Sequence, residues 1–332
     1  MKYKVFTHTI DKTKAKVRKA TIKHAAIVLL LSLGFTATAQ ESTAPKDFDF
    51  PENTEMALEI KGTYDAEKHT FTQTNAKEYR FNGKGQLVQL KEMFTAKIGS
   101  QDTYHYDEKG ELVKVDYLVG TAEGPISGSS THTIEKESYK TTYIRKDQNG
   151  DMLRTIAFFN EAGELRGKSF YNAKGEREKQ IEYDGTKAYR TKKFKGDKLV
   201  SDIIYENNKQ YKMVKKIEFT EPGKVPTKEQ LTSFDYNKKG DAEKMQVHYE
   251  TEAGKTPKVM NTYTMEYLYD GDLWVARIEY RHGYYKPSPT LNITLRSIKT
   301  SDKMYTAKDE KAVLDFCKQA YQNYLNTEKT NK

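Results

Sequence analysis

The stretch that decides the fold of this chain lies at residues 104–115 and reads YHYDEKGELVKV. Its two ends have the alternating aromatic and β-branched residues typical of strands. Between them stand Asp107 and, three positions later, Gly110. Asp at the first position of a type I turn accepts a backbone N–H within the turn, and Gly at the fourth adopts the left-handed conformation that returns the chain antiparallel. The stretch therefore predicts a β-hairpin.

The same turn recurs along the chain as an aromatic residue, Asn or Asp, two free positions and Gly. The copies read FNGKG at 81–85, FNEAG at 159–163, YNAKG at 171–175 and YNKKG at 236–240. Successive aromatic anchors such as Tyr171 and Tyr183 lie 11–13 residues apart, which is one strand plus one turn. The sequence thus predicts an all-β fold, an antiparallel meander of repeated hairpins that forms an open, curled or solenoid-like sheet.

Aromatic residues also recur two positions apart before several of these turns. In a strand, residues i and i+2 share a face, so neighbouring hairpins would stack the rings into a ladder. Tyrosine favours strands, and most of these rings are expected to be structural. An open sheet cannot bury both faces, however, so an exposed part of the ladder is predicted to bind a glycan or peptide. The candidate binding residues are Tyr104, Tyr106, Phe234, Tyr236, Tyr267, Tyr269 and Trp274.

Segments such as YHYDEKGEL at residues 104–112 resemble the YD repeats of the RHS-type family, whose unit reads roughly Tyr-x-Tyr-Asp-x-x-Gly-x-Leu. The match covers about half of the chain after residue 39, in scattered units. Leucine becomes Arg177 in one unit and Ala242 in another, and no RHS-type core motif or toxin domain is present. The resemblance implies β-hairpin arrays of the kind found in exported or surface bacterial proteins, with a role in adhesion or scaffolding.

The chain divides into five expected parts. Residues 1–39 form a signal peptide, 40–55 a polar linker, 56–220 one β-repeat region, and 231–300 a second that continues the same sheet or forms a subdomain. A Gly/Ser loop is expected at 120–132, and the Pro- and Gly-containing segment 221–230 is the better candidate boundary. A C-terminal capping helix is expected at 306–326.

The expected helix rests on an apolar stripe at helical spacing. Thr306 with Asp309 resembles a capping box at its start. A single amphipathic helix must bury such a stripe, so it is expected to cover a face or end of the sheet. The stripe consists of Val313, Cys317, Ala320, Tyr321 and Tyr324.

The first 39 residues have the three parts of a secretion signal. A basic region is followed by the apolar run AAIVLLLSLGF at 25–35 and by small residues at 37–39, which predicts cleavage after Ala39. The run is too short to span a bilayer, so no stable membrane span is expected after cleavage. The whole chain carries +9, but residues 1–39 hold eight bases and one acid, which leaves about +2. The basic balance is therefore no sign of nucleic-acid binding.

No residue pattern predicts catalysis, a metal or a cofactor. The histidines lack metal spacing, and His105 is expected on the exposed face opposite the tyrosine ladder. The oxygen donors of 147–151 are explained by the repeated turn. Cys317 is the one cysteine, so no internal disulfide is expected, and its place on the apolar stripe predicts a buried structural thiol.

The sequence therefore predicts an exported, non-enzymatic protein of the periplasm, cell surface or medium. Its expected role is that of a binding or scaffold module for a cell-envelope glycan, peptide or protein. Two alternatives stay open: a carrier that holds an apolar ligand on a curved sheet, and a hydrolase with carboxylates from separate strands. A concave face lined by Leu, Val and Phe would favour the carrier, and two close carboxylates the hydrolase.

Overall fold

A computed structural model describes residues 43–330, apart from 95–98, 122, 186, 209–212, 220–227, 253–254 and 283–287. The predicted signal peptide and cleavage site lie outside the described residues, as does most of the predicted boundary at 221–230. None of the described helices is long and apolar enough to cross a membrane.

The described residues form one 20-stranded antiparallel sheet, so the all-β prediction is confirmed. The first strands are β1 (Thr54–Asp65), β2 (Thr70–Phe81), β3 (Leu87–Met93), β4 (Gly99–Tyr106), β5 (Leu112–Thr121), β6 (Gly124–Glu137), β7 (Lys140–Asp147), β8 (Met152–Phe159), β9 (Leu165–Tyr171) and β10 (Arg177–Asp184). They are followed by β11 (Lys187–Lys195), β12 (Lys198–Asn207), β13 (Met213–Phe219), β14 (Lys228–Tyr236), β15 (Ala242–His248), β16 (Thr251–Glu252), β17 (Val259–Asp270), β18 (Leu273–His282), β19 (Thr290–Thr300) and β20 (Met304–Tyr305). A 3₁₀ turn, η1 (Pro45–Phe48), precedes them, and the helix α2 (Glu310–Thr330) follows.

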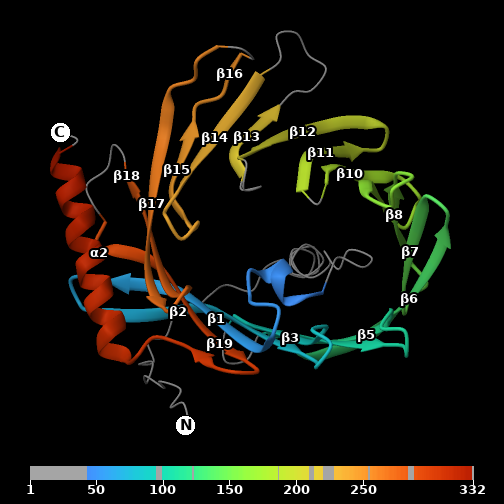
Figure 1. Cartoon of the computed structure of the whole chain (residues 1–332), viewed down its shortest axis with the longest axis horizontal. Coiled ribbons are helices and arrows are strands. Elements are labelled where there is room, and N and C mark those ends of the chain that lie inside the picture. The colour runs from blue at the N-terminus through green and yellow to red at the C-terminus, as the bar shows by residue number, and fades with distance from the viewer. Residues whose placement is uncertain are drawn as a thin grey trace. The chain divides into compact units, whose positions relative to one another are not determined.

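The meander closes on itself. Each strand pairs with the next, except that β15 pairs with β17 while the short β16 attaches to β14. β1 pairs with β2 on one side and with β19 on the other, from Thr54–Thr300 to Asp65–Thr290. Within the described residues, eighteen strands therefore form a closed antiparallel β-barrel (Figure 1). The expectation of an open, curled or solenoid-like sheet is wrong, because β19 occupies the edge of β1 that an open sheet would leave unpaired.

Two segments distinguish the inner from the outer wall of this barrel. The blue turn η1 lies inside the ring of strands, and α2 lies outside it beside β17 and β18 (Figure 1). Phe48 of η1 packs on Tyr79 of β2, with ring centroids 5.0 Å apart, so the face of Tyr79 is the inner one. Paired residues of an antiparallel ladder share a face. Tyr79 is paired with Ala57 of β1, and the successive residue pairs from Tyr79 through β3 to β19 lead back to the face of Ala57. The inner wall is therefore continuous around the barrel.

The repeated turns have the predicted chemistry. Asp107 Oδ1 accepts the N–H of Glu111 at 2.7 Å, and the N–H of Gly110 donates to the Asp107 carbonyl at 3.0 Å. Gly110 has a φ of +79°, the left-handed value that the turn requires. The side-chain oxygens of five further turn residues accept the equivalent N–H, namely Asn82, Asp147, Asn160, Asn172 and Asn237.

Two boundary predictions need correction. The expected Gly/Ser loop at 120–132 is instead a hairpin, since Leu112–Thr121 pairs with Gly124–Glu137. Small side chains do not prevent pairing when the neighbouring strand continues the ladder. The expected linker at 40–55 contains η1 and the buried Phe50, and its last residues begin β1. Strands on both sides of residues 221–230 belong to the same sheet, so residues 231–300 continue that sheet, which is the first of the two alternatives predicted for them.

The C-terminal helix covers the outer wall, as predicted. The five residues of its apolar stripe pack against Tyr64, Ile278, Tyr280, Leu291 and Ile293. The helix begins at Glu310, four residues later than expected, because the carboxylate of Asp309, rather than Thr306, accepts the N–H of Ala312 at 2.7 Å. Cys317 is buried and burial raises its pKa to about 12, which fits a structural thiol.

Polar contacts fix the position of α2 on the wall. The hydroxyl of Tyr324 donates to the carbonyl of Arg281 at 3.0 Å. The imidazole of His282 lies 2.8 Å from Glu328 Oε1 through Nδ1 and 2.9 Å from Thr264 Oγ1 through Nε2, and both His282 and Glu328 are buried. Buried polar groups with satisfied partners specify one arrangement of packed elements.

The two turn glycines Gly110 and Gly163 provide a matched test of the turn. Alanine at either must adopt a φ near +78°, which costs about 1–2 kcal/mol. A Cβ at Gly110 would also lie 2.9 Å from Gln86 Nε2, which donates to the Gly110 carbonyl, whereas nothing lies within 4 Å at Gly163. We expect Gly110→Ala to lower the free energy of unfolding in urea by about 1 kcal/mol more than Gly163→Ala, because this hydrogen bond is disturbed. Unchanged stability in both variants would contradict the turn assignment.

The packing of α2 is tested by placing a charge beneath it. Ala320 is fully buried against the barrel, so Ala320→Arg should lower the free energy of unfolding by about 3 kcal/mol or more through overpacking and an unpaired buried charge. Gln322→Arg, on the exposed side of the same helix, is the control and should change stability little. Thermal unfolding of the two variants gives the comparison. Equal melting temperatures would show that α2 does not pack on the barrel.

Candidate functional site

All seven predicted binding residues lie on the inner wall. Register places Tyr104 opposite Val115, Phe234 opposite Met245 and Tyr267 opposite Arg277, all on the face that continues from Tyr79. Their partners two residues further along, Tyr106, Tyr236 and Tyr269, share that face. The predicted pairing of aromatic residues at i and i+2 is therefore confirmed. His105 is exposed on the opposite face, as expected, and lies 2.8 Å from Asp116.

The structure brings only some of these seven residues together. The ring of Tyr267 lies 5.9 Å from that of Tyr269 and 6.0 Å from that of Trp274. Tyr104 packs instead against the cluster that contains Phe48 and Phe50. Phe234 and Tyr236 stand on β14, with β15 between them and β17. The candidates thus form several aromatic groups along one wall.

The hydroxyl groups of three inner-wall tyrosines bond to backbone carbonyls of the wall itself. Tyr106 donates to the carbonyl of Leu87 at 2.8 Å, Tyr236 to that of Met213 at 2.6 Å, and Tyr267 to that of Ala242 at 2.6 Å. Burial raises the pKa of Tyr267 to about 12 and also raises that of Tyr106. These bonds tether each ring to a neighbouring strand. Such rings are suited to stacking rather than to proton transfer.

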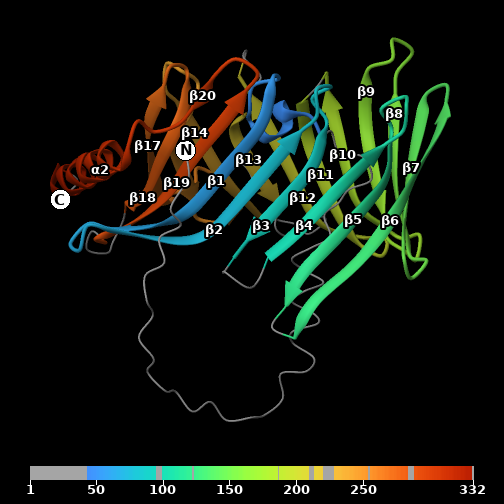
Figure 2. The same ribbon diagram turned by 90° about the horizontal axis from the view of Figure 1, so that it is seen from below.

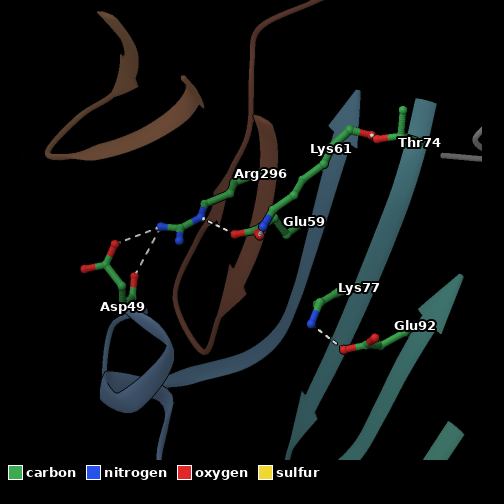
Figure 3. Close-up of polar contacts among 7 residues, drawn as sticks. All are labelled: Asp49, Glu59, Lys61, Thr74, Lys77, Glu92 and Arg296. Carbon is green, nitrogen blue, oxygen red and sulfur yellow. Dashed lines mark hydrogen bonds and ion pairs between the residues drawn. The ribbon is translucent and has the colours of Figure 1, made fainter. Parts of the chain in front are cut away.

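A row of alternating charges crosses the same wall and was not predicted from the sequence. Arg296 of β19 pairs with Glu59 of β1, Glu59 with Lys77 of β2, and Lys77 with Glu92 of β3. Figure 3 shows the row: Arg296 Nε lies 3.1 Å from Glu59 Oε2, and the ammonium of Lys77 contacts the carboxylate of Glu92. The period-two spacing of these residues places each on one face, but only the register shows that opposite charges meet.

Arg296 connects this charge row to the aromatic residues. Its guanidinium lies 3.6 Å from the centre of the Trp274 ring and 5.2 Å from that of Phe50, which are cation–π distances. Its Nη1 contacts Asp49 Oδ2 at 3.0 Å (Figure 3). The side chain of Arg296 is only 10% exposed. Trp274 is buried beneath it, so it supports the site rather than forming its open surface.

Further titratable groups lie on the inner wall beyond the charge row. Burial raises the pKa of Asp102, and the nearby Glu92 raises it further. Burial lowers the pKa of Arg145, which is paired in register with His132. Burial and then the charge of Arg145 lower the pKa of His132 to about 4, so this imidazole is neutral at physiological pH.

The arrangement supports binding more than catalysis. Tethered rings alternate with desolvated charges, which is the composition of a surface that stacks on and hydrogen-bonds to an amphipathic ligand. Among the described residues, no group of three or more His, Cys, Asp and Glu side chains is placed to hold a metal ion. The oxygens of residues 147–151 serve the turn, since Asp147 Oδ1 accepts the N–H of both Asn149 and Asp151 at 2.9 Å.

Two carboxylates of one hairpin should respond oppositely to amidation. The pKa of Asp102 is raised in the folded state above its usual value of 3.8. The free energy of unfolding therefore falls as the pH rises from this usual value to the raised folded-state pKa. Asp102→Asn should therefore be more stable than wild type at pH 7, with the gain vanishing at low pH.

Asp116, on the outer wall, is the matched control. Hydrogen bonds from Lys114 and His105 lower its pKa, so Asp116→Asn should be less stable than wild type at pH 7. Denaturant unfolding between pH 3 and pH 7 measures both differences. A change of the same sign in the two variants would contradict this account of the inner wall.

Comparisons with known proteins were made by sequence and by structure. No family model matches the chain, and no curated protein matches it. A solved structure described as a porin-like protein from Bacteroides uniformis is similar to this chain, with a TM-score of 0.38 and 9% sequence identity, over 74% of this chain and 98% of that one.

Proposed function

We propose that this chain is an exported, non-catalytic binding protein that holds an extended ligand along the inner wall of its barrel. The observation that carries the proposal is the continuous register, which places every predicted binding aromatic residue on one wall. Because hydroxyls such as those of Tyr106 and Tyr267 bond to backbone carbonyls, the rings stay in place without a ligand. A preorganised surface of this kind binds with little loss of side-chain entropy. The ligand class we propose is a cell-envelope glycan or peptide.

The charges of the inner wall favour this ligand class over an apolar cargo. The inner wall carries the charged residues Glu59, Lys77, Glu92 and Arg296. On β10, the ammonium nitrogen of Lys179 lies 4.0 Å from the centre of the Phe170 ring. Transfer of an entirely apolar ligand against such groups would desolvate them without compensation. Sugars and peptides offer both apolar faces and hydrogen-bonding groups, so they match the wall.

The outer wall supports a location in water. Charged residues stand in the middle of its strands, for example Lys114 beside Asp116 at 2.8 Å, and Arg190 paired with Asp202 at 2.6 Å. A lysine or arginine facing lipid at the midplane of a β-barrel costs about 2–4 kcal/mol. We therefore propose that the exported protein works in the periplasm, at the cell surface or in the medium with its outer wall wetted.

A carboxylate-based hydrolase is the second candidate. Glu92 and Asp102 face the interior from neighbouring strands, and the raised pKa of Asp102 is a property of general acids. Lys77 is already paired with Glu92, so this carboxylate is not free to activate a water molecule. Hydrolysis of an envelope glycan that disappears in Asp102→Asn would favour the hydrolase over the binding protein.

Substitution of inner-wall rings tests the binding function. Labelled envelope oligosaccharides and short peptides would be screened against the protein by fluorescence anisotropy. We expect Tyr267→Ala to weaken binding of any ligand found by about tenfold or more, since truncation of an aromatic anchor in a binding surface costs about 2 kcal/mol or more. Tyr189→Ala is the control, because this ring is 40% exposed and its hydroxyl bonds to Glu182 of the outer wall. Equal loss in both variants would contradict an inner-wall site.

A further inference from the structure

The inner wall already holds a peptide segment of this chain. Residues 43–53, which we call the plug, precede β1 and contain η1. The plug lies inside the ring of strands (Figures 1 and 2). Its first described residue, Thr43, accepts the N–H of Leu87 through its carbonyl at 3.0 Å, and its hydroxyl Oγ1 lies at hydrogen-bond distance, 3.0 Å, from the Tyr106 hydroxyl. The plug thus contacts one of the predicted binding residues.

Two aromatic rings of the plug occupy the wall. Phe48 lies 5.0 Å from Tyr79 and 6.1 Å from Phe81, measured between ring centroids. Phe50 meets Tyr79 edge to face at 5.2 Å and is only 5% exposed. Edge-to-face and offset contacts at these distances are the favourable geometry for aromatic pairs. The wall therefore recognises two phenylalanines that are spaced two residues apart.

An acidic residue stands between the two rings. Asp49 contacts Arg296 through its carboxylate at 3.0 Å, and its carbonyl lies 3.4 Å from the same Nη1 atom (Figure 3). Arg296 is held in place by Glu59 and by the ring of Trp274, so its outer edge is free to meet an acidic group of the segment. The Asp49 side chain is 75% exposed, so its ion pair with Arg296 contributes little to the binding free energy of the plug. The pair instead determines which charge is accepted between the two rings.

The plug has little structure of its own. Its regular part is a single 3₁₀ turn of four residues, and Asp49 adopts a φ of +62° that is unfavourable for a residue other than glycine. Contacts with the wall therefore determine its conformation. A segment of this kind opens at a lower free energy than the barrel strands beside it.

We propose that the inner wall is a receptor for peptide segments with the pattern aromatic–acidic–aromatic, and that the plug is the resident occupant that such a segment from a partner protein displaces. This inference rests on the proposed binding function and names its ligand class. Phe48, Asp49 and Phe50 define the pattern; Tyr79 and Arg296 read it, and Trp274 supports Arg296 from beneath.

Peptide exchange in trans tests the proposal on the full mature chain. The probe is a fluorescein-labelled peptide of residues 43–53, TAPKDFDFPEN. In wild type the tethered plug competes at an effective concentration in the millimolar range, so micromolar peptide should not bind. In the Phe48→Ala/Phe50→Ala variant we expect the peptide to bind at least tenfold more tightly, with a matching change in the fluorescence of Trp274, the one tryptophan of the chain.

Matched controls separate recognition from loss of structure. Glu52→Ala changes a plug residue that is 84% exposed, and this variant should exclude the peptide as wild type does. A peptide with both phenylalanines replaced by alanine should bind neither protein. Equal binding of the two peptides, or equal affinity in wild type and the double variant, would overturn the proposal. A wild-type dimer that the double variant loses would also overturn it, because the plug would then be exchanged between copies.

Hydrogen exchange on wild type keeps the test valid if the double variant does not fold. The amide of Phe50 donates to the carbonyl of Pro45 at 3.1 Å, so its exchange reports on the plug. Unlabelled peptide at several millimolar should accelerate exchange of this amide at least tenfold and leave the amides of β1 and β2 unchanged. Protection of Phe50 that equals the strands and ignores the peptide would show that the plug is part of the core. Loss of an envelope ligand in Tyr267→Ala, together with failure of the peptide, would refute this inference while the proposed function stands.

Discussion

Closure of the sheet through β1 and β19 is the constraint on which the rest of the structure depends. Two antiparallel strands share faces in register, so a closed antiparallel meander has one inner and one outer row of side chains all the way round. Residues at opposite ends of the chain then stand beside each other, as Glu59 and Arg296 do. The charge row, the aromatic groups and the surface that holds the plug all depend on this closure, because it brings residues from both ends of the chain onto one inner wall. An open sheet of the same hairpins would leave Arg296 without Glu59.

Local chemistry made much of the fold predictable. The Asn or Asp side chain and the left-handed glycine of each turn act within five residues, so a sequence pattern is sufficient to find them. The stripe of α2 is equally local, and its five residues pack as expected. Closure is different, because no feature of Thr54–Asp65 indicates that Thr290–Thr300 will be its neighbour. Hydrogen bonding of two strand edges requires only compatible backbones and faces, which many strands of this chain share.

The sequence predicted which aromatic residues of a strand share a face, but not which surface of the barrel that face belongs to. Spacing at i and i+2 correctly put Tyr104 with Tyr106 and Tyr267 with Tyr269. It could not distinguish the inside of a barrel from the outside, because both walls alternate polar and apolar residues. The plug was missed for a related reason. Residues 40–55 are polar on average, and the two phenylalanines at 48 and 50 become significant only when a facing aromatic wall is known.

Closure also has a consequence for the order in which the chain folds. Hairpins such as β4 and β5 join residues close in sequence and can form as soon as both strands have emerged. The second partner of β1 is nearly the last strand made, so β1 remains an unprotected edge while almost every other strand is paired. An unpaired strand edge is a template for aggregation. The final step of folding, in which β19 pairs with β1, is therefore expected to be slow. The yield of folded protein should rise when a chaperone, or the solution conditions, protect the free edge of β1 until the C-terminal strands are available.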